Sequence, residues 1–251
     1  MSLTNPAPLY TERQELAQSL KNQGFAIVAP EDVAAIANVS LPELESLGVL
    51  WEGLPRDPYL KDGGRYRFRR HASYQITGGI CNSVAHRAHW QSLDYNALHG
   101  GIERWFEPIQ DQLISHLAWQ SLLLGIVGVL NSLKPVRTWF IEAHQFRIDT
   151  TGGIGRPTPE GAHRDGVDFV AVILVDRVCI KGGETRIFDA AGPEGLRFTL
   201  EQPWTLLLMN DERMIHESTP IQPIGDHGHR DTLILTFRSN GFQDSPTRSQ
   251  L

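Results

Sequence analysis

HRDGVDFVAVILVD, residues 163–176, joins a polar start to a strongly apolar run. In an extended strand, successive side chains point to opposite faces. The segment 168–176 (DFVAVILVD) has apolar residues at both alternating sets of positions, which predicts a central strand that is covered on both faces. At the polar start, His163 and Asp165 lie two residues apart, so both would point the same way on an extended chain.

Short strands dominate the chain after Pro135. The candidates are residues 138–149, 168–176, 184–189, 196–200, 204–209, 213–218 and 231–238. Glycine-rich or polar turns such as TTGGIGRPTPEG, KGG and IGDHGH separate them. Many short strands with turn signals and no intervening helices are typical of a β-sandwich or β-barrel.

The first half of the chain predicts a different mixture of elements. Residues 11–22 and 41–50 predict short helices, residues 25–28 and 65–76 predict strands, and residues 102–133 predict a long helical stretch. Its interior, Leu122 to Leu130, is apolar nearly all round, so we expect this helix to pack against a sheet. The predicted fold class is therefore mainly β with flanking α-helices.

Composition and size narrow the class of protein. The chain has 251 residues, 41% hydrophobic and 21% charged, which fits one ordinary globular domain. A net charge of −6 does not favour nucleic-acid binding. The longest apolar run has nine residues and the N-terminal MSLTNPAPLYTERQE lacks an apolar signal core, so we expect no membrane span and a cytoplasmic protein. The two cysteines, Cys81 and Cys179, show no metal-type spacing.

His163, Asp165 and His216 form a candidate metal site. The first two would share one face of an extended segment, and His216 lies in the predicted strand 213–218, which would run beside them in a closed β-structure. Two imidazoles and one carboxylate leave several coordination positions open, which suits non-haem Fe(II) with a co-substrate and oxygen. A structural zinc site would fill all four positions with protein ligands.

Arg230 and Thr232 form a candidate anion site on the last strand. They share one face with Ile234 and Thr236, whereas Leu233, Leu235 and Phe237 share the other. This split predicts that one face is turned toward a pocket and the other toward covering helices. An arginine with a hydroxyl two residues later can hold a carboxylate through several charge-assisted hydrogen bonds.

The ordered set His163-Arg-Asp165, His216 and Arg230-Asp-Thr232 resembles the motif of the Fe(II)- and 2-oxoglutarate-dependent dioxygenases. The surrounding sequence, PTPEGAHRDGVDFV with GGETRIFD and HRDTLILTF, resembles the bacterial L-isoleucine 4-hydroxylase-like family of free-amino-acid hydroxylases. The resemblance is strong over residues 139–240 and weaker upstream, through YRFRRHASY and GGIERWFEPI. It implies a double-stranded β-helix (a jelly-roll, cupin-like core) buttressed by N-terminal helices.

The resemblance also implies a single dioxygenase domain and its reaction. Residues 1–137 would provide helical and strand support with a substrate flap, residues 138–240 the β-core, and residues 241–251 a tail. The resemblance implies that His163, Asp165 and His216 bind Fe(II), and that Arg230 and Thr232 bind 2-oxoglutarate. With O2, such an enzyme hydroxylates an unactivated C–H bond and releases succinate and CO2. The expected substrate is a free, aliphatic L-amino acid similar to isoleucine, leucine or methionine.

A second basic group is expected to bind the substrate carboxylate. Arg147 is the first candidate, because it shares a strand face with Gln145 on a strand that borders the site. Arg67, within RYRFRR, is the second candidate, as part of a covering flap. Asp168, three residues beyond Asp165, could meet the substrate ammonium.

Several alternatives stay open. The same chemistry could act on a tethered aminoacyl group, a peptide or another small acid, or the chain could be a metal-binding cupin-type protein without redox activity. The run Asp226-His-Gly-His229 is typical of a polar hairpin turn more than of a second metal site. His216-Glu217 lacks the second histidine of the HExxH spacing. His71, His86, His89, His99, His116 and His144 show no grouping in the sequence.

Overall fold

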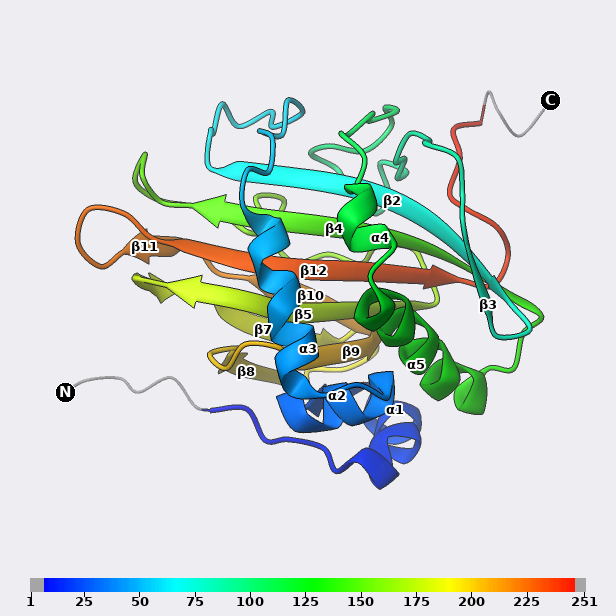
Figure 1. Cartoon of the computed structure of the whole chain (residues 1–251). Coiled ribbons are helices and arrows are strands. Elements are labelled where there is room, and N and C mark those ends of the chain that lie inside the picture. The colour runs from blue at the N-terminus through cyan, green and yellow to red at the C-terminus, as the bar shows by residue number, and fades with distance from the viewer. Residues whose placement is uncertain (1–6, 247–251) are drawn as a thin grey trace.

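One large antiparallel sheet runs through the centre of the protein in the computed structural model, which describes residues 7–246 (Figure 1). In hydrogen-bonding order its seven strands are β1 (Phe25–Val28), β9 (Leu206–Asn210), β5 (Phe169–Val178), β12 (His229–Arg238), β4 (Thr138–Asp149), β2 (Arg67–Thr77) and β3 (Ile80–Ser83). Strands from both ends of the chain are thus neighbours, and the predicted strand 168–176 lies near the middle of the sheet.

Smaller sheets face the large one. A three-stranded sheet contains β10 (Met214–Ser218), β7 (Glu184–Asp189) and β8 (Gly195–Thr199), and a two-stranded sheet contains β11 (Ile221–Pro223) and β6 (Ile180–Gly182). All of these strands pair in antiparallel fashion. A large sheet opposed by a smaller one, with flanking helices, is a double-stranded β-helix, so the predicted fold class is confirmed.

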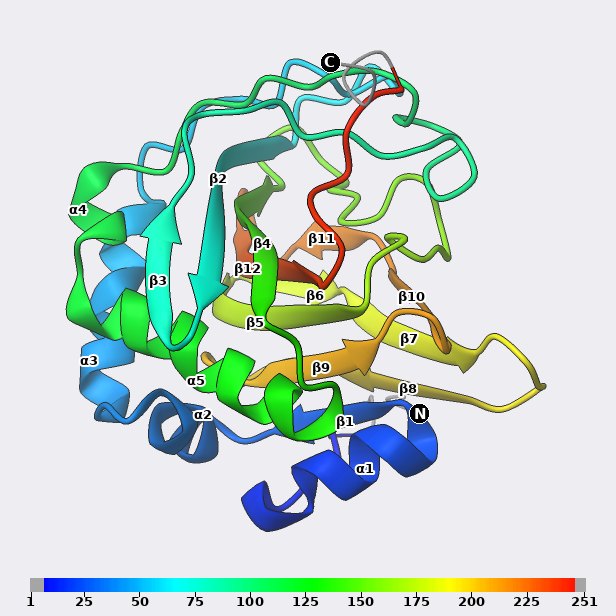
Figure 2. The same cartoon turned by 90° about the vertical axis from the view of Figure 1, so that its right-hand side faces the viewer.

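Helices cover the other face of the large sheet, as Figure 2 shows. They are the 3-10 turn η1 (Arg13–Glu15), α1 (Leu16–Gln23), α2 (Pro30–Ala37), α3 (Leu41–Glu45), the 3-10 turn η2 (Ser46–Trp51), α4 (Asp111–Ile114) and α5 (Leu117–Leu133). The apolar stretch Leu122 to Leu130 lies within α5 and packs on the sheet, as its composition predicts.

The alternation of side chains along the strands divides the interior into two cores. On β5, Ala171 and Ile173 pack toward the helices, whereas Val170 and Val172 pack between the two sheets. This explains why the strand is apolar on both faces. On β12, Leu233, Leu235 and Phe237 join the helix-side core, which leaves the opposite face of that strand to the space between the sheets.

The expected helix over residues 102–133 is wrong in its first part. Pro108 interrupts this region, and residues 102–110 lie outside any helix. Residues 84–110 instead form a long irregular segment, attached to β2 through an isolated bridge between His71 and Pro108 and to itself through one between His89 and Arg104. This segment lies over the space between the sheets, where it contributes to the site described below.

Residues 1–6 and 247–251, which include part of the expected tail, lie outside the described residues. Residues 241–246 of that tail contact the domain, since the ring of Phe242 packs edge-on against Phe140 at 5.2 Å between centroids. Within residues 7–246, no single helix has the length and apolar character needed to cross a bilayer; by those two criteria alone one sharply bent pair, Pro30–Ala37 with Leu41–Trp51, would qualify.

Gly125 allows α5 to approach α2 closely, which provides a test of the helix layer. A Cβ added at Gly125 would lie 2.2 Å from the carbonyl oxygen of Ile36, whereas one added at Gly128, on the same helix, would meet nothing within 4 Å. We expect Gly125→Ala to lower the free energy of unfolding by about 1–3 kcal/mol, because the backbones must separate. Gly128→Ala should raise it by about 0.5–1 kcal/mol through helix propensity.

Urea denaturation of the two variants beside the wild type measures both effects. A stabilised Gly125→Ala protein would contradict the close α2–α5 packing.

Candidate metal centre and its cavity

Backbone pairing brings the two predicted histidine ligands together. His163 and His216 form an isolated antiparallel bridge, in which each backbone N–H donates to the other residue's carbonyl oxygen at 3.0 and 2.9 Å. Directly paired residues place their side chains on the same face, and the two imidazole rings lie 4.6 Å apart between centroids. His216 belongs to β10, while His163 and Asp165 lie in the loop that leads into β5.

The three side chains converge on one point. Asp165 Oδ1 lies 3.8 Å from His163 Nε2, and Asp165 Oδ2 lies 3.8 Å from His216 Nε2. The Nδ1 atom of His163 donates to the carbonyl of Gly161 at 2.9 Å, which leaves the Nε2 lone pair free for a metal. Burial and the neighbouring His163 lower the pKa of His216 to about 3, so this imidazole is neutral, the form that binds metals. The donor set fits Fe(II).

A buried carboxylate holds the loop that carries Asp165. Asp211 accepts hydrogen bonds from the backbone N–H groups of Asp165, Gly166 and Val167 at 3.0, 2.7 and 3.0 Å. Burial and the charge of Asp165 raise the pKa of Asp211. Two carboxylates so close together repel each other, and a cation between the ligands would offset that repulsion. The Gln243 amide donates to the carbonyls of Asp165 and Gly166, so the C-terminal segment also supports the site.

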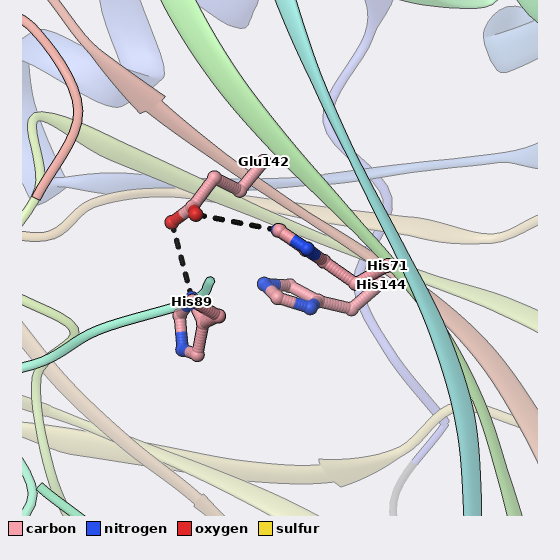
Figure 3. Close-up of side chains that lie close together, drawn as sticks. All are labelled: His71, His89, Glu142 and His144. Carbon is pink, nitrogen blue, oxygen red and sulfur yellow. Dashed lines mark hydrogen bonds and ion pairs between the residues drawn. The ribbon is translucent and has the colours of Figure 1, made fainter. Parts of the chain in front are cut away.

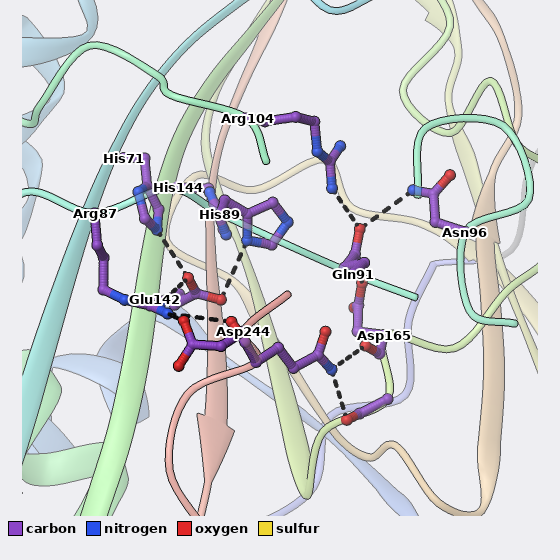
Figure 4. Close-up of polar contacts among 12 residues, drawn as sticks. His71, Arg87, His89, Gln91, Asn96, Arg104, Glu142, His144, Asp165 and Asp244 are labelled. Atoms are coloured by element: carbon purple, nitrogen blue, oxygen red, sulfur yellow. Dashed lines mark hydrogen bonds and ion pairs between the residues drawn. The ribbon is translucent and has the colours of Figure 1, made fainter. Parts of the chain in front are cut away.

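Gln91 orients the Asp165 carboxylate from the irregular segment 84–110 (Figure 4). Its Nε2 atom donates to Asp165 Oδ1 at 2.9 Å, while its Oε1 atom accepts from Arg104 at 2.8 Å and from Asn96 at 3.3 Å. Because Gln91 uses both ends of its amide, its orientation is determined by its partners. The metal carboxylate is therefore connected by hydrogen bonds to a buried arginine.

A cavity of about 100 Å³ lies against the metal group and contains the predicted anion site. Arg230 and Thr232 line it, as do Ile234 and Thr236, so the predicted division of β12 into a pocket face and a helix face is confirmed. Arg230 is 3% exposed, and its Nη1 atom donates to Ser218 Oγ at 3.4 Å. Its Nε and Nη2 atoms have no partner among the described residues. Burial and nearby Arg177 lower its pKa to about 10. Such a guanidinium fits a carboxylate ligand.

The cavity wall also carries three more buried arginines: Arg67 and Arg69 on β2, and Arg104 in the segment 84–110. Asp57 lies 2.8 Å from Arg67 and 3.7 Å from Arg69. No carboxylate of residues 7–246 lies within ion-pair distance of Arg104. Burial and Arg67 lower the pKa of Arg104 to about 10. This wall therefore holds more positive charge than Asp57 balances.

A second group of possible metal ligands lies beside the cavity: His71, His89, Glu142 and His144 (Figure 3). The sequence showed no grouping of these histidines, because they come from β2, the segment 84–110 and β4. Glu142 lies 3.3 Å from His71 Nε2 and 3.1 Å from His89 Nδ1. Burial lowers the pKa of His89 to about 4 and holds that of His144 well below its usual range. The group is therefore a buried network of neutral imidazoles around one carboxylate.

This network suits hydrogen bonding better than a cation. The rings of His71 and His144 are stacked, with 22° between their planes, so their in-plane lone pairs do not converge on one point. Arg69 donates to His144 Nδ1 at 2.6 Å, and Arg87 donates to Glu142 at 3.0 Å. Guanidinium groups at both ends already supply the positive charge that a metal would bring. We infer that the network positions Arg69 and the strands β2 and β4.

The structure does not bring Arg147 into the cavity. Arg147 and Gln145 share a face of β4, as expected, but it is the helix-side face, whereas His144, Phe146 and Ile148 face the cavity. The Arg147 guanidinium instead donates to Asp231 at 2.8 and 2.7 Å and to Glu52 at 2.8 Å. The expectation placed Arg147 on the wrong face of β4. A shift of one residue along a strand moves each side chain to the opposite face.

We expect Arg147→Ala to leave the substrate KM and the 2-oxoglutarate affinity unchanged. The free energy of unfolding should fall by about 2 kcal/mol, less than the roughly 3–5 kcal/mol for a fully buried pair, because solvent reaches Glu52. Steady-state kinetics and urea denaturation separate the two readouts. An increased KM in a fully folded variant would place Arg147 at the substrate after all.

Two further expectations also need correction. Asp168 lies outside the cavity, where it forms an ion pair with Lys134 and accepts from the backbone N–H of Ser239 at 2.7 Å. Arg67 does line the cavity, but on a regular strand of the large sheet and not on a flap. The covering role belongs to the segment 84–110. Arg69 could have been found from the alternation in RYRFRR, since it shares a face with Arg67.

Comparisons with known proteins agree with this geometry. A family model described as 2OG-Fe dioxygenase matches residues 49–236. The crystal structure of a bsmA homolog from Methylobium petroleophilum PM1 has a TM-score of 0.90 and 49% sequence identity, and the match covers 97% of this chain and 100% of that one. IDO from Bacillus thuringiensis gives a TM-score of 0.71 at 16% identity, covering 92% and 100%.

A third structure, the Fe(II)/(alpha)ketoglutarate-dependent dioxygenase TqaL, gives a TM-score of 0.69 at 18% identity, covering 90% of this chain and 86% of that one. At such identities, IDO and TqaL show a shared fold alone. No curated protein matches the chain.

Proposed function

The chain belongs to the 2OG-Fe dioxygenase family, whose model spans residues 49–236, and on this basis we propose that it hydroxylates an unactivated C–H bond of a free L-amino acid. The reaction would consume O2 and 2-oxoglutarate and release succinate and CO2. The proposed amino acid has an aliphatic side chain of the isoleucine, leucine or methionine type. The family assigns Fe(II), 2-oxoglutarate and O2 to the enzyme; the amino-acid substrate is our proposal.

The chain's own residues have separate tasks in this reaction. His163, Asp165 and His216 would hold Fe(II), which together with 2-oxoglutarate supplies the oxidising power when bound. Arg230 would bind the distal carboxylate of 2-oxoglutarate through its two unpartnered donors, next to the Thr232 hydroxyl. The segment 84–110 covers the cavity and limits access of water to the reacting groups.

The charges of the cavity wall support a small substrate with charged groups. After Arg230 is assigned to 2-oxoglutarate, Arg69 and Arg104 still face the cavity with Nε atoms that have no partner in residues 7–246. Glu160 faces the same cavity, and its Oε2 atom is buried without a partner in the described part of the chain. Two arginines and a carboxylate that each keep an unused buried hydrogen-bonding atom among the described residues, in one small space, suit a zwitterion, and this observation carries the proposal.

A substrate screen tests the proposal. The protein is incubated with Fe(II), ascorbate, 2-oxoglutarate and each amino acid of a panel, and both succinate and the hydroxylated product are measured. We expect stoichiometric succinate and product with at least one aliphatic L-amino acid. Turnover only with peptides or carrier-bound aminoacyl groups would move the substrate to that class. Tight metal and ligand binding without succinate would favour a non-redox binding protein.

A further inference from the structure

We propose that Arg104 and Arg69 form the binding site for the carboxylate of the primary substrate and that Glu160 binds its ammonium group. This assignment rests on the proposed function in so far as the ligand is an amino acid. The carboxylate part also holds for any small organic acid that enters the cavity. The two arginines would then be specificity-determining residues, distinct from Arg230.

Arg104 has the properties of an anion receptor that lacks its anion. Its side chain faces the cavity and is 2% exposed. One nitrogen, Nη2, donates to Gln91, whereas Nε is buried without a partner among the described residues. Burial of a guanidinium without a counter-ion costs several kcal/mol. A bound carboxylate would recover part of that cost through charge-assisted hydrogen bonds.

Arg69 is held beside it in a fixed orientation. Its guanidinium carbon lies 3.6 Å from the ring centre of Phe106 and 4.3 Å from that of Phe146, so two aromatic faces enclose it. Its Nη2 atom donates to His144, and its Nε atom has no partner within residues 7–246. Arg69 shares the single carboxylate of Asp57 with Arg67, so two arginines face one counter-charge there.

Glu160 provides the opposite charge near the metal group. Its Oε1 atom lies 3.7 Å from His163 Nε2, and its Oε2 atom is buried and accepts no hydrogen bond from the described residues. A buried carboxylate oxygen that accepts no hydrogen bond attracts a cation with several N–H donors, such as an ammonium group. The cavity thus offers cationic and anionic contacts, as the two charged groups of an α-amino acid require.

Gln91 connects the carboxylate site to the metal site (Figure 4). The same amide donates to the metal ligand Asp165 and accepts from Arg104. Two hydrogen bonds through Gln91 therefore connect Arg104 to Asp165. A substrate anchored at Arg104 would be placed accurately with respect to the metal, which is what selection of one C–H bond requires.

Binding measurements without turnover test the assignment. The Fe(II) protein is titrated by calorimetry under anaerobic conditions with 2-oxoglutarate present. The probes are L-isoleucine, L-leucine and L-methionine, their carboxamides, and the corresponding acids that lack the amino group. The variants are Arg104→Gln, Arg104→Lys, Arg69→Gln and Glu160→Gln. Arg70→Gln is the matched control, because Arg70 neighbours Arg69 on β2 but does not line the cavity.

We expect Arg104→Gln and Arg69→Gln to weaken binding of carboxylate-bearing probes roughly 10- to 150-fold, with the carboxamides unaffected. Arg104→Lys should recover part of the loss. Glu160→Gln should weaken the amino acids and carboxamides, but not the acids without an amino group. The 2-oxoglutarate affinity should stay at the wild-type level in all variants, which also shows that they fold.

Four outcomes would overturn the assignment or separate it from the proposed function. If wild type and Arg104→Gln bound the acids with equal affinity, Arg104 would not belong to the site. If the wild type bound none of these probes, the whole assignment would be refuted. If binding of the acids required Arg104 but no amino acid was hydroxylated, the carboxylate site would be supported and the proposed function refuted. If the enzyme hydroxylated an amino acid and no variant changed the affinity for it, the proposed function would be supported and the carboxylate site refuted.

Discussion

Asp165→Ala is expected to abolish Fe(II) binding and succinate formation. Asp165 supplies the one carboxylate of the ligand group, and its two oxygens lie 3.8 Å from the nitrogens of His163 and His216. Without this charge, two neutral imidazoles remain, a poor site for a divalent cation. The loss of metal affinity should exceed the roughly 10–100-fold that removal of an outer hydrogen-bond partner costs. Metal analysis after gel filtration and a succinate assay measure both effects.

Asp168→Asn is the matched control for this prediction. Asp168 lies three residues further along the same segment but forms its ion pair with Lys134 outside the cavity. We expect it to retain full metal content and activity, with at most a modest loss of stability. Gln91→Leu should lie between the two, about 10–100-fold weaker in metal affinity, because Gln91 donates to Asp165 without binding the metal. An Asp165→Ala protein that keeps its iron would place the metal elsewhere, with the His71, His89, Glu142 and His144 network as the next candidate.

Periodic parts of the sequence predict the fold well, and irregular parts do not. The predicted strands 138–149 and 184–189 match β4 and β7 residue for residue, because turn-forming residues mark their ends: Pro135 and TTGG flank the first, and KGG and AAGPEG flank the second. The short strands β6 and β11 were missed, since three residues carry no detectable period. The false helix over 102–110 arose because scattered apolar residues there fit a helical pattern, although backbone bridges to other segments determine the structure.

The residues of the candidate site also divide into those that the sequence predicted and those that it did not. The sequence predicted the grouping of His163, Asp165 and His216 from residue type and order, and it predicted the cavity face of β12, with Arg230, from alternation. Arg147 failed because alternation shows which residues share a face but not which of the two faces is turned inward. Arg104 and Gln91 lie in an irregular segment, where no local pattern states what they contact. Only the long-range pairing of that segment brings them to the metal.

Arg230→Gln is expected to weaken 2-oxoglutarate binding far more than substrate binding. Removing one partner of a buried charged pair costs about 2–5 kcal/mol, which corresponds to roughly 30-fold to several thousand-fold in affinity. Arg230 is 3% exposed and has two unpartnered nitrogens, so the carboxylate that it binds would lose both its counter-charge and its hydrogen bonds. Calorimetric titration of the Fe(II) protein with 2-oxoglutarate under anaerobic conditions gives the affinity directly.

Arg177 provides the matched control, because it is the register partner of Arg230 on β5 yet does not line the cavity. Arg177→Gln should bind 2-oxoglutarate about as well as the wild type, since Arg177 donates to the carbonyl of Gly182 and does not line the cavity. Arg230→Lys should keep part of the affinity, because an ammonium supplies the charge but not the two-pronged geometry. If Arg230→Gln retained full 2-oxoglutarate affinity while Arg104→Gln lost it, the two anion sites would have to be exchanged, and the substrate carboxylate would then lie on β12 beside Thr232.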